Sequence, residues 1–185
     1  EDRVRTHAQN QTTSDPEAGT KVWLTSQGER LVFVPDGAGG YVTPDSVYGT
    51  LEPNTPQAGS YTWEDKAGNL VVFDAAGKLQ QMEDRYGNGV ELAYDQNGKI
   101  DTVTDLVASG RWLDFTFVSG DLEEIEDFTG RTWTYVVGIN LTSMTAPSDE
   151  QTPEATVEYT YYNSQYPTIS GLLKEIEVND PADPD

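Results

Sequence analysis

Apolar and polar residues alternate along several segments in the middle of the chain. Residues 113–117 read Leu, Asp, Phe, Thr and Phe, and residues 90–94 and 133–135 alternate in a similar way. Successive side chains of a β-strand point to opposite faces of the sheet, so each segment predicts a strand with one apolar and one polar face. No stretch shows a convincing helical period. The pattern therefore predicts an all-β fold built on an antiparallel sheet.

A short sequence unit recurs from residue 61 onward and separates these strands. The segment from Asp74 to Leu79 returns as Asp95 to Ile100, and more weakly around Gly120. An Asp side chain can bond its own backbone and Gly accepts a positive φ, so Asp-x-x-Gly predicts a turn. Internal repetition of this kind is typical of a repeat protein.

Pairs of apolar residues three positions apart mark each unit. The pairs are Leu79/Met82, Ile100/Val103, Leu122/Ile125 and Leu141/Met144. Two residues after each of the first three pairs stands an aspartate, followed by a glycine and an aromatic strand. These aspartates, Asp84, Asp105 and Asp127, are 21 and 22 residues apart. We therefore predict a repeat sheet with about two strands per 21–22-residue unit. The turn and core residues that define it are Asp74, Gly77, Leu79, Met82, Asp84, Tyr94, Asp95, Gly98, Ile100, Val103, Asp105, Gly110, Arg111, Gly120, Leu122, Ile125, Asp127, Gly130 and Arg131.

The rest of the chain divides around these repeats. We expect a flexible leader over residues 1–20, an N-terminal β-hairpin and a proline-bearing cap region over 21–60, repeats over 61–145, a loop over 146–155, and a final strand pair with an acidic tail over 156–185. The hairpin follows from two apolar runs, 22–24 and 31–34, separated by a glycine-containing turn. Residues 35–60, irregular and proline-bearing, are the candidate cap of the array.

The last apolar-patterned segment, residues 172–178, lacks an obvious cap. Leu173 and Ile176 repeat the spacing of three that marks the units. An uncapped strand offers unpaired backbone groups to another chain. We expect this strand to pair on one side within the chain, while its other edge is open or filled by another copy or by the next repeat.

The repeat resembles that of the Rhs/YD-repeat family. The resemblance rests on Tyr94-Asp95-x-x-Gly98-x-Ile100-x-x-Val103-x-Asp105, followed by Gly110-Arg111. It covers residues 61–145 closely and 156–178 loosely. The literal Tyr-Asp pair occurs at 94–95, and Phe73-Asp74 is a near match.

The resemblance implies a long antiparallel sheet that spirals into a hollow shell. In bacterial toxin complexes and polymorphic toxins of this kind the shell encloses a toxic C-terminal segment, and in teneurins it forms an extracellular body used in cell–cell contact. It therefore implies a secreted or cell-surface protein, with an enclosed C-terminal domain as a further partner. Nothing in this chain matches the self-cleaving core region of the toxin shells, so no proteolytic residue is carried over.

The composition of the chain excludes several classes of binding partner. The 185 residues include 32 acidic and 11 basic side chains, for a net charge of -21. Such a charge repels nucleic acids and anionic lipids, so we expect no nucleic-acid partner. No apolar run approaches the 18 residues that a membrane span needs, so we expect no membrane insertion. The chain has no cysteine, which excludes disulfides and thiolate-bound metals.

Three clusters of residues are candidate sites of chemistry or binding. Carboxylates at positions 123, 124, 126 and 127 could serve glycoside hydrolysis, or could be a solvated strand and turn. Asp95-x-Asn97 opens like a calcium loop, but the sixth and twelfth positions hold Ile100 and Leu106 where an EF-hand needs Gly and Glu. Weak association with cations remains open. The third cluster, an aromatic set that could stack on sugars or pack in a core, comprises Trp63, Trp112, Trp133, Tyr86, Tyr94 and Tyr135.

The arginines that follow the turn glycines favour a structural role. Arg111 and Arg131 are expected to pair with turn carboxylates such as Asp105 or Asp127. We assign no catalytic, cofactor-binding or metal-binding residue and expect no cofactor and no enzymatic activity. The sequence favours a non-catalytic structural segment of an Rhs-like protein. The alternative is an extracellular module that binds glycans or a partner protein through exposed aromatics or a sheet edge.

Overall fold

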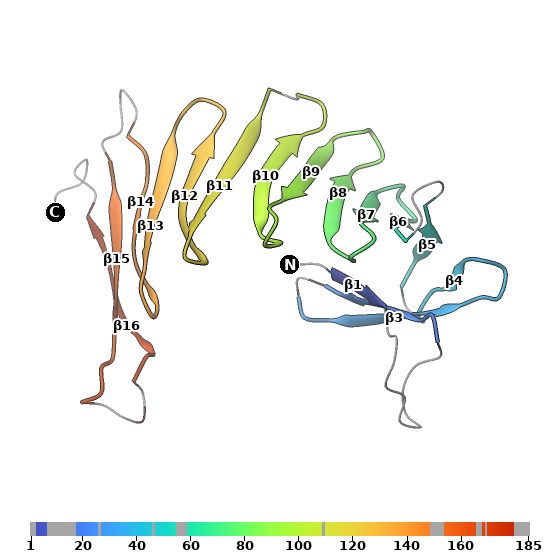
Figure 1. The fold of residues 1–185 in the computed structure, drawn as a ribbon, viewed down its shortest axis with the longest axis horizontal. Coiled ribbons are helices and arrows are strands. Elements are labelled where there is room, and N and C mark those ends of the chain that lie inside the picture. The colour runs from blue at the N-terminus through green and yellow to red at the C-terminus, as the bar shows by residue number, and fades with distance from the viewer. Residues whose placement is uncertain are drawn as a thin grey trace. The chain divides into compact units, whose positions relative to one another are not determined.

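The computed structural model describes residues 3–6, 18–25, 27–45, 47–54, 59–108, 110–148, 154–165, 168 and 170–179 (Figure 1). These residues form strands, turns and bends without any α-helix, so the predicted all-β fold is confirmed. It follows that no helix of this part of the chain is long and apolar enough to cross a membrane.

Sixteen strands occur in the described residues. They are β1 (Arg3–Thr6), β2 (Lys21–Leu24), β3 (Arg30–Pro35), β4 (Tyr41–Val42), β5 (Gly49–Pro53), β6 (Tyr61–Asp65), β7 (Leu70–Phe73), β8 (Leu79–Glu83), β9 (Gly89–Tyr94), β10 (Ile100–Asp105), β11 (Trp112–Val118), β12 (Asp121–Asp127), β13 (Thr132–Val137), β14 (Leu141–Thr145), β15 (Thr156–Tyr161) and β16 (Leu173–Asn179).

The strands form two antiparallel sheets. The first has the order β1-β2-β3-β4, in which β4 adds a two-residue pairing to β3. The second contains β5 to β16 in the order of the chain. Each strand of the second sheet therefore neighbours the strand that precedes it, as a succession of hairpins requires.

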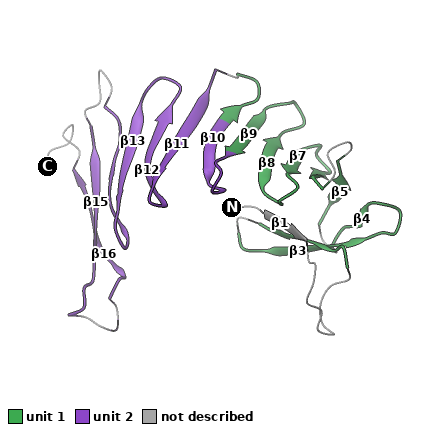
Figure 2. Ribbon diagram, viewed as in Figure 1, with its two compact units in different colours: residues 1–93, 104–109 green, residues 94–103, 110–185 purple. Residues whose placement is uncertain are grey.

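The contacts divide the chain into two compact units (Figure 2). Unit 1 contains residues 1–93 and 104–109, and unit 2 contains residues 94–103 and 110–185. Strands β1 to β8 lie wholly in unit 1, and strands β11 to β16 lie wholly in unit 2.

Unit 1 holds the buried apolar core. Trp23 of β2 and Phe33 of β3 pack edge-to-face on Trp63 of β6, with ring centroids 5.9 and 5.5 Å away. Phe73 of β7 approaches Trp23 to 5.4 Å, and Leu51 of β5 is fully buried in the same cluster. The first sheet therefore covers the apolar face of β5 to β7.

Unit 2 is a sheet with one apolar and one polar face. Phe115 lies directly opposite Ile125, which lies opposite Trp133 on its other side. On the other face Asp114 lies opposite Glu126. No apolar residue of the described part of unit 2 is fully buried, so the apolar face there has no cover comparable to that in unit 1.

The spacing of three between apolar residues has a structural cause, which is a β-bulge in alternate strands. In β8, Leu79 lies opposite Phe73 and Met82 lies opposite Val71. One residue between them, Gln80, therefore has no residue opposite it on β7. This extra residue lets two side chains three positions apart share a face. The unmatched residues in the four recorded bulges are Gln80, Glu123, Thr142 and Lys174.

Two expectations about the N-terminal region were wrong in part. Residues 3–6, expected in a flexible leader, form β1 and pair with β2. The cap was placed in residues 35–60, but Trp23 and Phe33, which both precede that range, are buried in the core. From the predicted range, Tyr41 and Val47 pack against this core and are partly buried. Residues 49–53 are β5, a strand of the long sheet itself. The other residues of the leader, except 18–20, and the acidic tail after 179 lie outside the described residues.

Candidate functional site

Each Asp-x-x-Gly turn is held by a carboxylate that faces its own backbone. In the turn between β9 and β10, the Asp95 Oδ1 atom accepts hydrogen bonds from the backbone NH groups of Asn97 (2.9 Å) and Lys99 (2.8 Å). The Gly98 NH donates to the Asp95 carbonyl at 2.9 Å. Gly98 has a φ of 80°, which glycine adopts without steric cost. The predicted turn is therefore confirmed in its residues and in its cause.

The same loop joins other hairpins. An aspartate Oδ1 atom accepts from the NH groups two and four residues later in the loops that begin at Asp36, Asp65, Asp74, Asp84, Asp95 and Asp127. Asp36 and Asp65 were not among the turn residues predicted from the sequence. The signal was present, because Gly39 and Gly68 complete the same Asp-x-x-Gly pattern.

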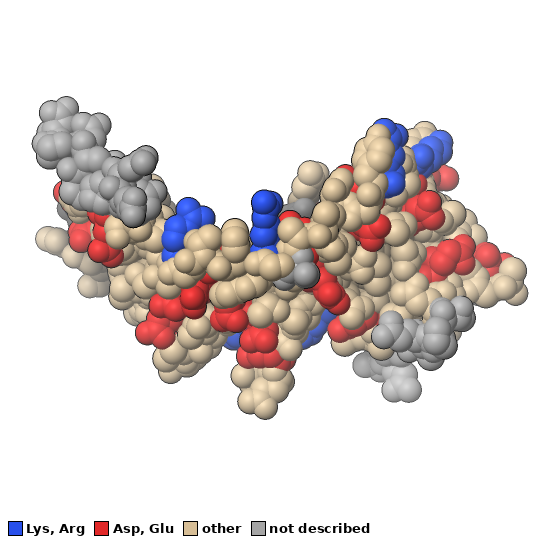
Figure 3. Space-filling view, turned by 90° about the horizontal axis from the view of Figure 1, so that it is seen from above, with Lys and Arg blue, Asp and Glu red and all other residues tan. Residues whose placement is uncertain are grey.

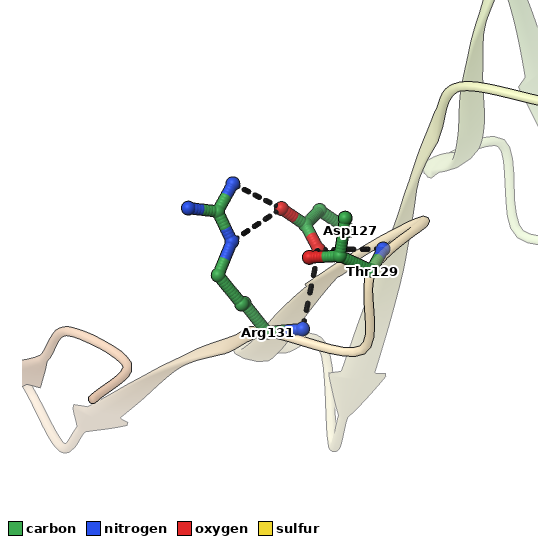
Figure 4. A network of polar contacts seen from close by, with 3 residues as sticks. All are labelled: Asp127, Thr129 and Arg131. Atoms are coloured by element: carbon green, nitrogen blue, oxygen red, sulfur yellow. Dashed lines mark hydrogen bonds and ion pairs between the residues drawn. The ribbon is translucent and has the colours of Figure 1, made fainter. Parts of the chain in front are cut away.

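The most highly connected turn is that of Asp127, Thr129 and Arg131 (Figure 4). Asp127 is buried, and its Oδ1 accepts from the Thr129 hydroxyl at 2.6 Å. Its Oδ2 accepts from Arg131 Nε at 2.8 Å and from an Arg131 terminal nitrogen at 2.5 Å. The expected pairing of Arg131 with a turn carboxylate is confirmed. Arg111 lies exposed just before β11.

These contacts favour the ionised form of the turn carboxylates. The Thr129 hydroxyl, followed by the Arg131 guanidinium, holds the pKa of Asp127 well below its ordinary value. For Asp95 the main cause of the lowered pKa is the backbone NH of Lys99. The pKa is likewise lowered at Asp36, Asp65 and Asp84. Such groups are anchors of turns rather than proton donors at neutral pH.

Two predicted turns differ from this loop. Asp105 is followed by glycine only at Gly110, and its Oδ1 accepts from the NH groups two and three residues later. Between β11 and β12, Ser119 and Gly120 both have positive φ, 52° and 100°. That pair forms a tight two-residue hairpin turn, so the turn predicted at Gly120 is confirmed, but its loop is shorter than the Asp-x-x-Gly loop.

The remaining repeat-defining residues lie where their roles require. Gly77, Gly120 and Gly130 adopt positive φ in turns. The apolar members Leu79, Met82, Ile100, Val103, Leu122 and Ile125 lie on β8, β10 and β12, and Tyr94 ends β9.

The acidic cluster at residues 123–127 is divided by the sheet. Glu124 and Glu126 lie on the polar face, opposite Thr134 and Thr132 of β13. Asp127 is taken up by its turn, and its lowered pKa is the reverse of what a protonated catalytic acid needs. Asp127 is therefore unsuited to the role of the protonated acid in glycoside hydrolysis.

The aromatic residues do not form one stripe. Trp63 belongs to the core of unit 1. Tyr86 lies in a turn and is 71% exposed, with the Arg85 guanidinium 4.5 Å from its ring centroid. Trp133 and Tyr135 lie half-buried on the apolar face of unit 2. Core packing is confirmed for Trp63, whereas the aromatics of unit 2 remain accessible.

The apolar face of unit 2 is continuous across six strands, β11 to β16. Trp133 and Tyr135 are two positions apart on β13 and therefore share a face. Tyr135 lies opposite Met144 of β14. Met144 in turn lies opposite Val157 of β15, which lies opposite Val178 of β16. These residues continue the apolar row formed by Phe115, Ile125 and Trp133 across β11 to β13.

Basic side chains border this face at the turns. The Lys99 ammonium lies 4.5 Å from the ring centroid of Phe117, and the Arg131 guanidinium lies 5.6 Å from that of Trp133. The Lys99 Nζ also donates to the carbonyl of Gly120. Cations over aromatic faces are stabilising, and they leave this face less acidic than its reverse.

The polar face of unit 2 carries carboxylates in direct opposition. Asp114 lies opposite Glu126, and Glu158 lies opposite Glu177. Like charges directly opposite in a sheet are destabilising. Figure 3 shows acidic side chains gathered in larger patches than the basic ones.

The described residues contain no group of three or more acidic or histidine side chains placed to hold a metal ion. At the calcium-like segment, Asp95 Oδ2 accepts a hydrogen bond from the Asn97 side-chain amide at 3.2 Å, while Oδ1 accepts one from the Asn97 backbone NH.

Neither a protein-family model nor a curated protein matches this chain.

Proposed function

We propose that this chain is a non-catalytic structural segment of a secreted or cell-surface Rhs-like protein, where it contributes to a shell that encloses or displays another domain. The observation that carries the proposal is the unequal cover of the apolar face. In unit 1, Trp23 and Phe33 close it, whereas in unit 2 Ile125, Trp133 and Tyr135 stay half-buried. A contiguous apolar surface of this kind marks an interaction site.

The turns support the same proposal. Their aspartates satisfy their own backbone, so the polar residues that repeat most regularly serve the sheet rather than a reaction. In a shell, further repeats of the same polypeptide, another copy or an enclosed C-terminal domain are the partners. We name an Rhs-like protein because residues 61–145 resemble YD repeats.

Radical footprinting of the isolated chain and of a longer natural polypeptide that contains it tests the proposal. We expect Trp133 and Met144 to be labelled in the isolated chain and protected severalfold in the longer protein. Trp63 serves as the protected control and Tyr86 as the exposed control in both samples. Equal labelling of Trp133 in the two samples would contradict the proposal.

The exposed aromatics favour a second candidate, an extracellular module that binds glycans or a partner protein. Tyr86 projects from the turn after β8 with Arg85 over its ring. A glycan array probed with the chain and with Tyr86→Ala tests this function. Binding that Tyr86→Ala abolishes would support it, and the footprint of Trp133 would then be unchanged in the longer protein.

A further inference from the structure

The last strand of unit 2 has an open edge. Strand β16 pairs with β15 on one side and has no other neighbour among the described strands. All seven of its residues are exposed. Alternate residues of an edge strand present backbone NH and C=O groups that another strand can bond. One intrachain pairing was predicted from the sequence, and the structure confirms it.

The two faces of this edge differ in chemistry. Leu173, Ile176 and Val178 are 48%, 54% and 62% exposed, and the last two lie opposite Tyr159 and Val157 on the apolar face. Glu175 and Glu177 lie opposite Thr160 and Glu158 on the polar face. A strand added at the edge would set a side chain beside each of these residues.

The carboxylates of the edge are poorly compensated. Among the described residues no basic side chain forms an ion pair with Glu158 or Glu177, although they lie directly opposite each other. The Lys174 Nζ atom lies 3.9 Å from Glu175 Oε2, and both side chains are more than half exposed. A basic residue beside Glu177 would therefore offset a repulsion already present in the sheet.

Self-pairing of the edge meets the same repulsion. Two copies of β16 that pair antiparallel about Ile176 would set Glu175 of each copy beside Glu177 of the other. The net charge of -21 on each chain opposes the same encounter at longer range. Charge complementarity thus favours a strand of opposite charge over a second copy.

We propose that the free edge of β16 binds, by strand addition, an extended polypeptide segment that alternates basic with apolar residues. Backbone hydrogen bonds supply the pairing, and the alternate side chains supply the selectivity. The apolar residues of the segment extend the row of Ile176 and Val178, and its basic residues lie beside Glu175 and Glu177. The inference goes beyond the proposed shell, because it rests only on the edge and its charges.

The test measures binding of a peptide of alternating lysine and valine to the 185-residue chain, by fluorescence anisotropy. We expect the double variant Glu175→Lys/Glu177→Lys to weaken binding at least about tenfold, since it removes the complementary charge. The matched control Glu91→Lys/Asp101→Lys makes the same change of net charge at exposed positions on β9 and β10 and should alter binding less than about twofold. Amide exchange in residues 173–179 should slow on binding.

Two further peptides separate strand pairing from simple attraction of charge. The lysine–valine peptide with alternate backbone nitrogens methylated keeps its charge but loses its donors, so it should bind at least about tenfold more weakly. An alternating glutamate–valine peptide should bind the double variant better than the original chain. The proposal would be overturned if the methylated peptide bound as tightly as the unmethylated one, or if the matched control lost as much affinity as the double variant. Self-association of the chain through β16 in the absence of peptide would overturn it as well.

Discussion

At the scale of single residues, the turn aspartates are the most regular polar feature of the chain. In each five-residue loop one carboxylate oxygen satisfies two backbone NH groups that the turn leaves unpaired. A local hydrogen bond of this kind specifies the turn without help from distant residues. The same contacts tie the stability of the sheet to the ionisation of these carboxylates.

The first prediction concerns Asp127→Asn. Because the folded-state pKa of Asp127 is lowered, its ionised form stabilises the fold at any pH above the unfolded pKa of about 3.9. That stabilisation is lost as the pH falls through the folded-state pKa. The loss of unfolding free energy in Asp127→Asn should therefore be greatest and constant above about pH 5 and should shrink toward zero between pH 5 and pH 1, in urea titrations.

Asp101→Asn, an exposed change on β10, is the control for this titration. Its effect should stay within about 0.5 kcal/mol at neutral pH, as for most surface substitutions. A loss in Asp127→Asn that is the same at pH 7 and pH 2 would contradict the role of the ionised carboxylate.

The second prediction concerns Gly98, whose φ of 80° disfavours any other L-residue. Gly98→Ala should lower the unfolding free energy by on the order of 1 kcal/mol. Glu91→Gln, on the exposed face of β9, should change it by less than about 0.5 kcal/mol. Chemical denaturation measures both, and equal effects would be inconsistent with a turn that requires positive φ.

Single residues also show where the sequence was informative. The pairing of Arg131 with Asp127 was predictable, because a short loop brings positions four apart together. The positive φ of Ser119 was not predictable, since it follows from the tight connection of β11 to β12 rather than from the preference of serine itself.

At the scale of elements, the bulges explain why two periodicities coexist in the sequence. A regular strand places side chains two positions apart on one face, but the recurring apolar pairs are three apart. The unmatched residue at Gln80 supplies the extra step in β8, and Glu123 does so in β12. The bulges therefore keep the apolar residues of these strands on one face.

The third prediction compares two single-residue deletions. Removal of Gln80 converts a bulged strand to a regular one and leaves Leu79 and Met82 on the same face. Removal of Thr62 from the unbulged β6 makes Tyr61 and Trp63 adjacent, so that one of them must leave the apolar face.

Burying a large apolar side chain is worth about 1.5–3 kcal/mol. The Thr62 deletion should therefore destabilise the fold by about 2 kcal/mol more than the Gln80 deletion, as measured by urea denaturation. Equal losses from the two deletions would show that the bulge does not set the register.

Strand positions were predictable where alternation is clear, as in β11 and in the final pair β15 and β16. The strand β5 was missed because Pro53 and Pro56 made its surroundings look irregular. The cover of Trp63 by Trp23 and Phe33 was missed as well. It depends on contacts of Trp63 with residues 40 and 30 positions earlier in the chain, which local patterns do not encode.

At the scale of the whole molecule, charge is distributed unevenly. Residues 61–185 hold 24 of the 32 acidic side chains and 7 of the 11 basic ones. Direct oppositions such as Asp114 with Glu126 and Glu158 with Glu177 add local repulsion on the polar face of unit 2. Self-repulsion of this size opposes the compact state.

The fourth prediction follows from this repulsion. The melting temperature should rise as sodium chloride is increased from 0.01 to 0.15 M, because the Debye length falls from about 30 Å to about 8 Å. The variant Glu126→Gln/Glu177→Gln removes one carboxylate from each opposed pair, so its melting temperature should depend less on salt. A melting temperature that falls over this range would contradict the prediction.

The position of the core carries a consequence for the order of folding. Its six buried apolar residues lie between Trp23 and Phe73, so all of them are synthesised before any of the strands β8 to β16. Domains fold as units during synthesis at about 5–20 residues per second. Each later hairpin then needs only the strand made just before it, and contacts so close in sequence form rapidly. The growing sheet always ends in one unpaired strand, which the next segment to emerge can pair with as soon as it is made.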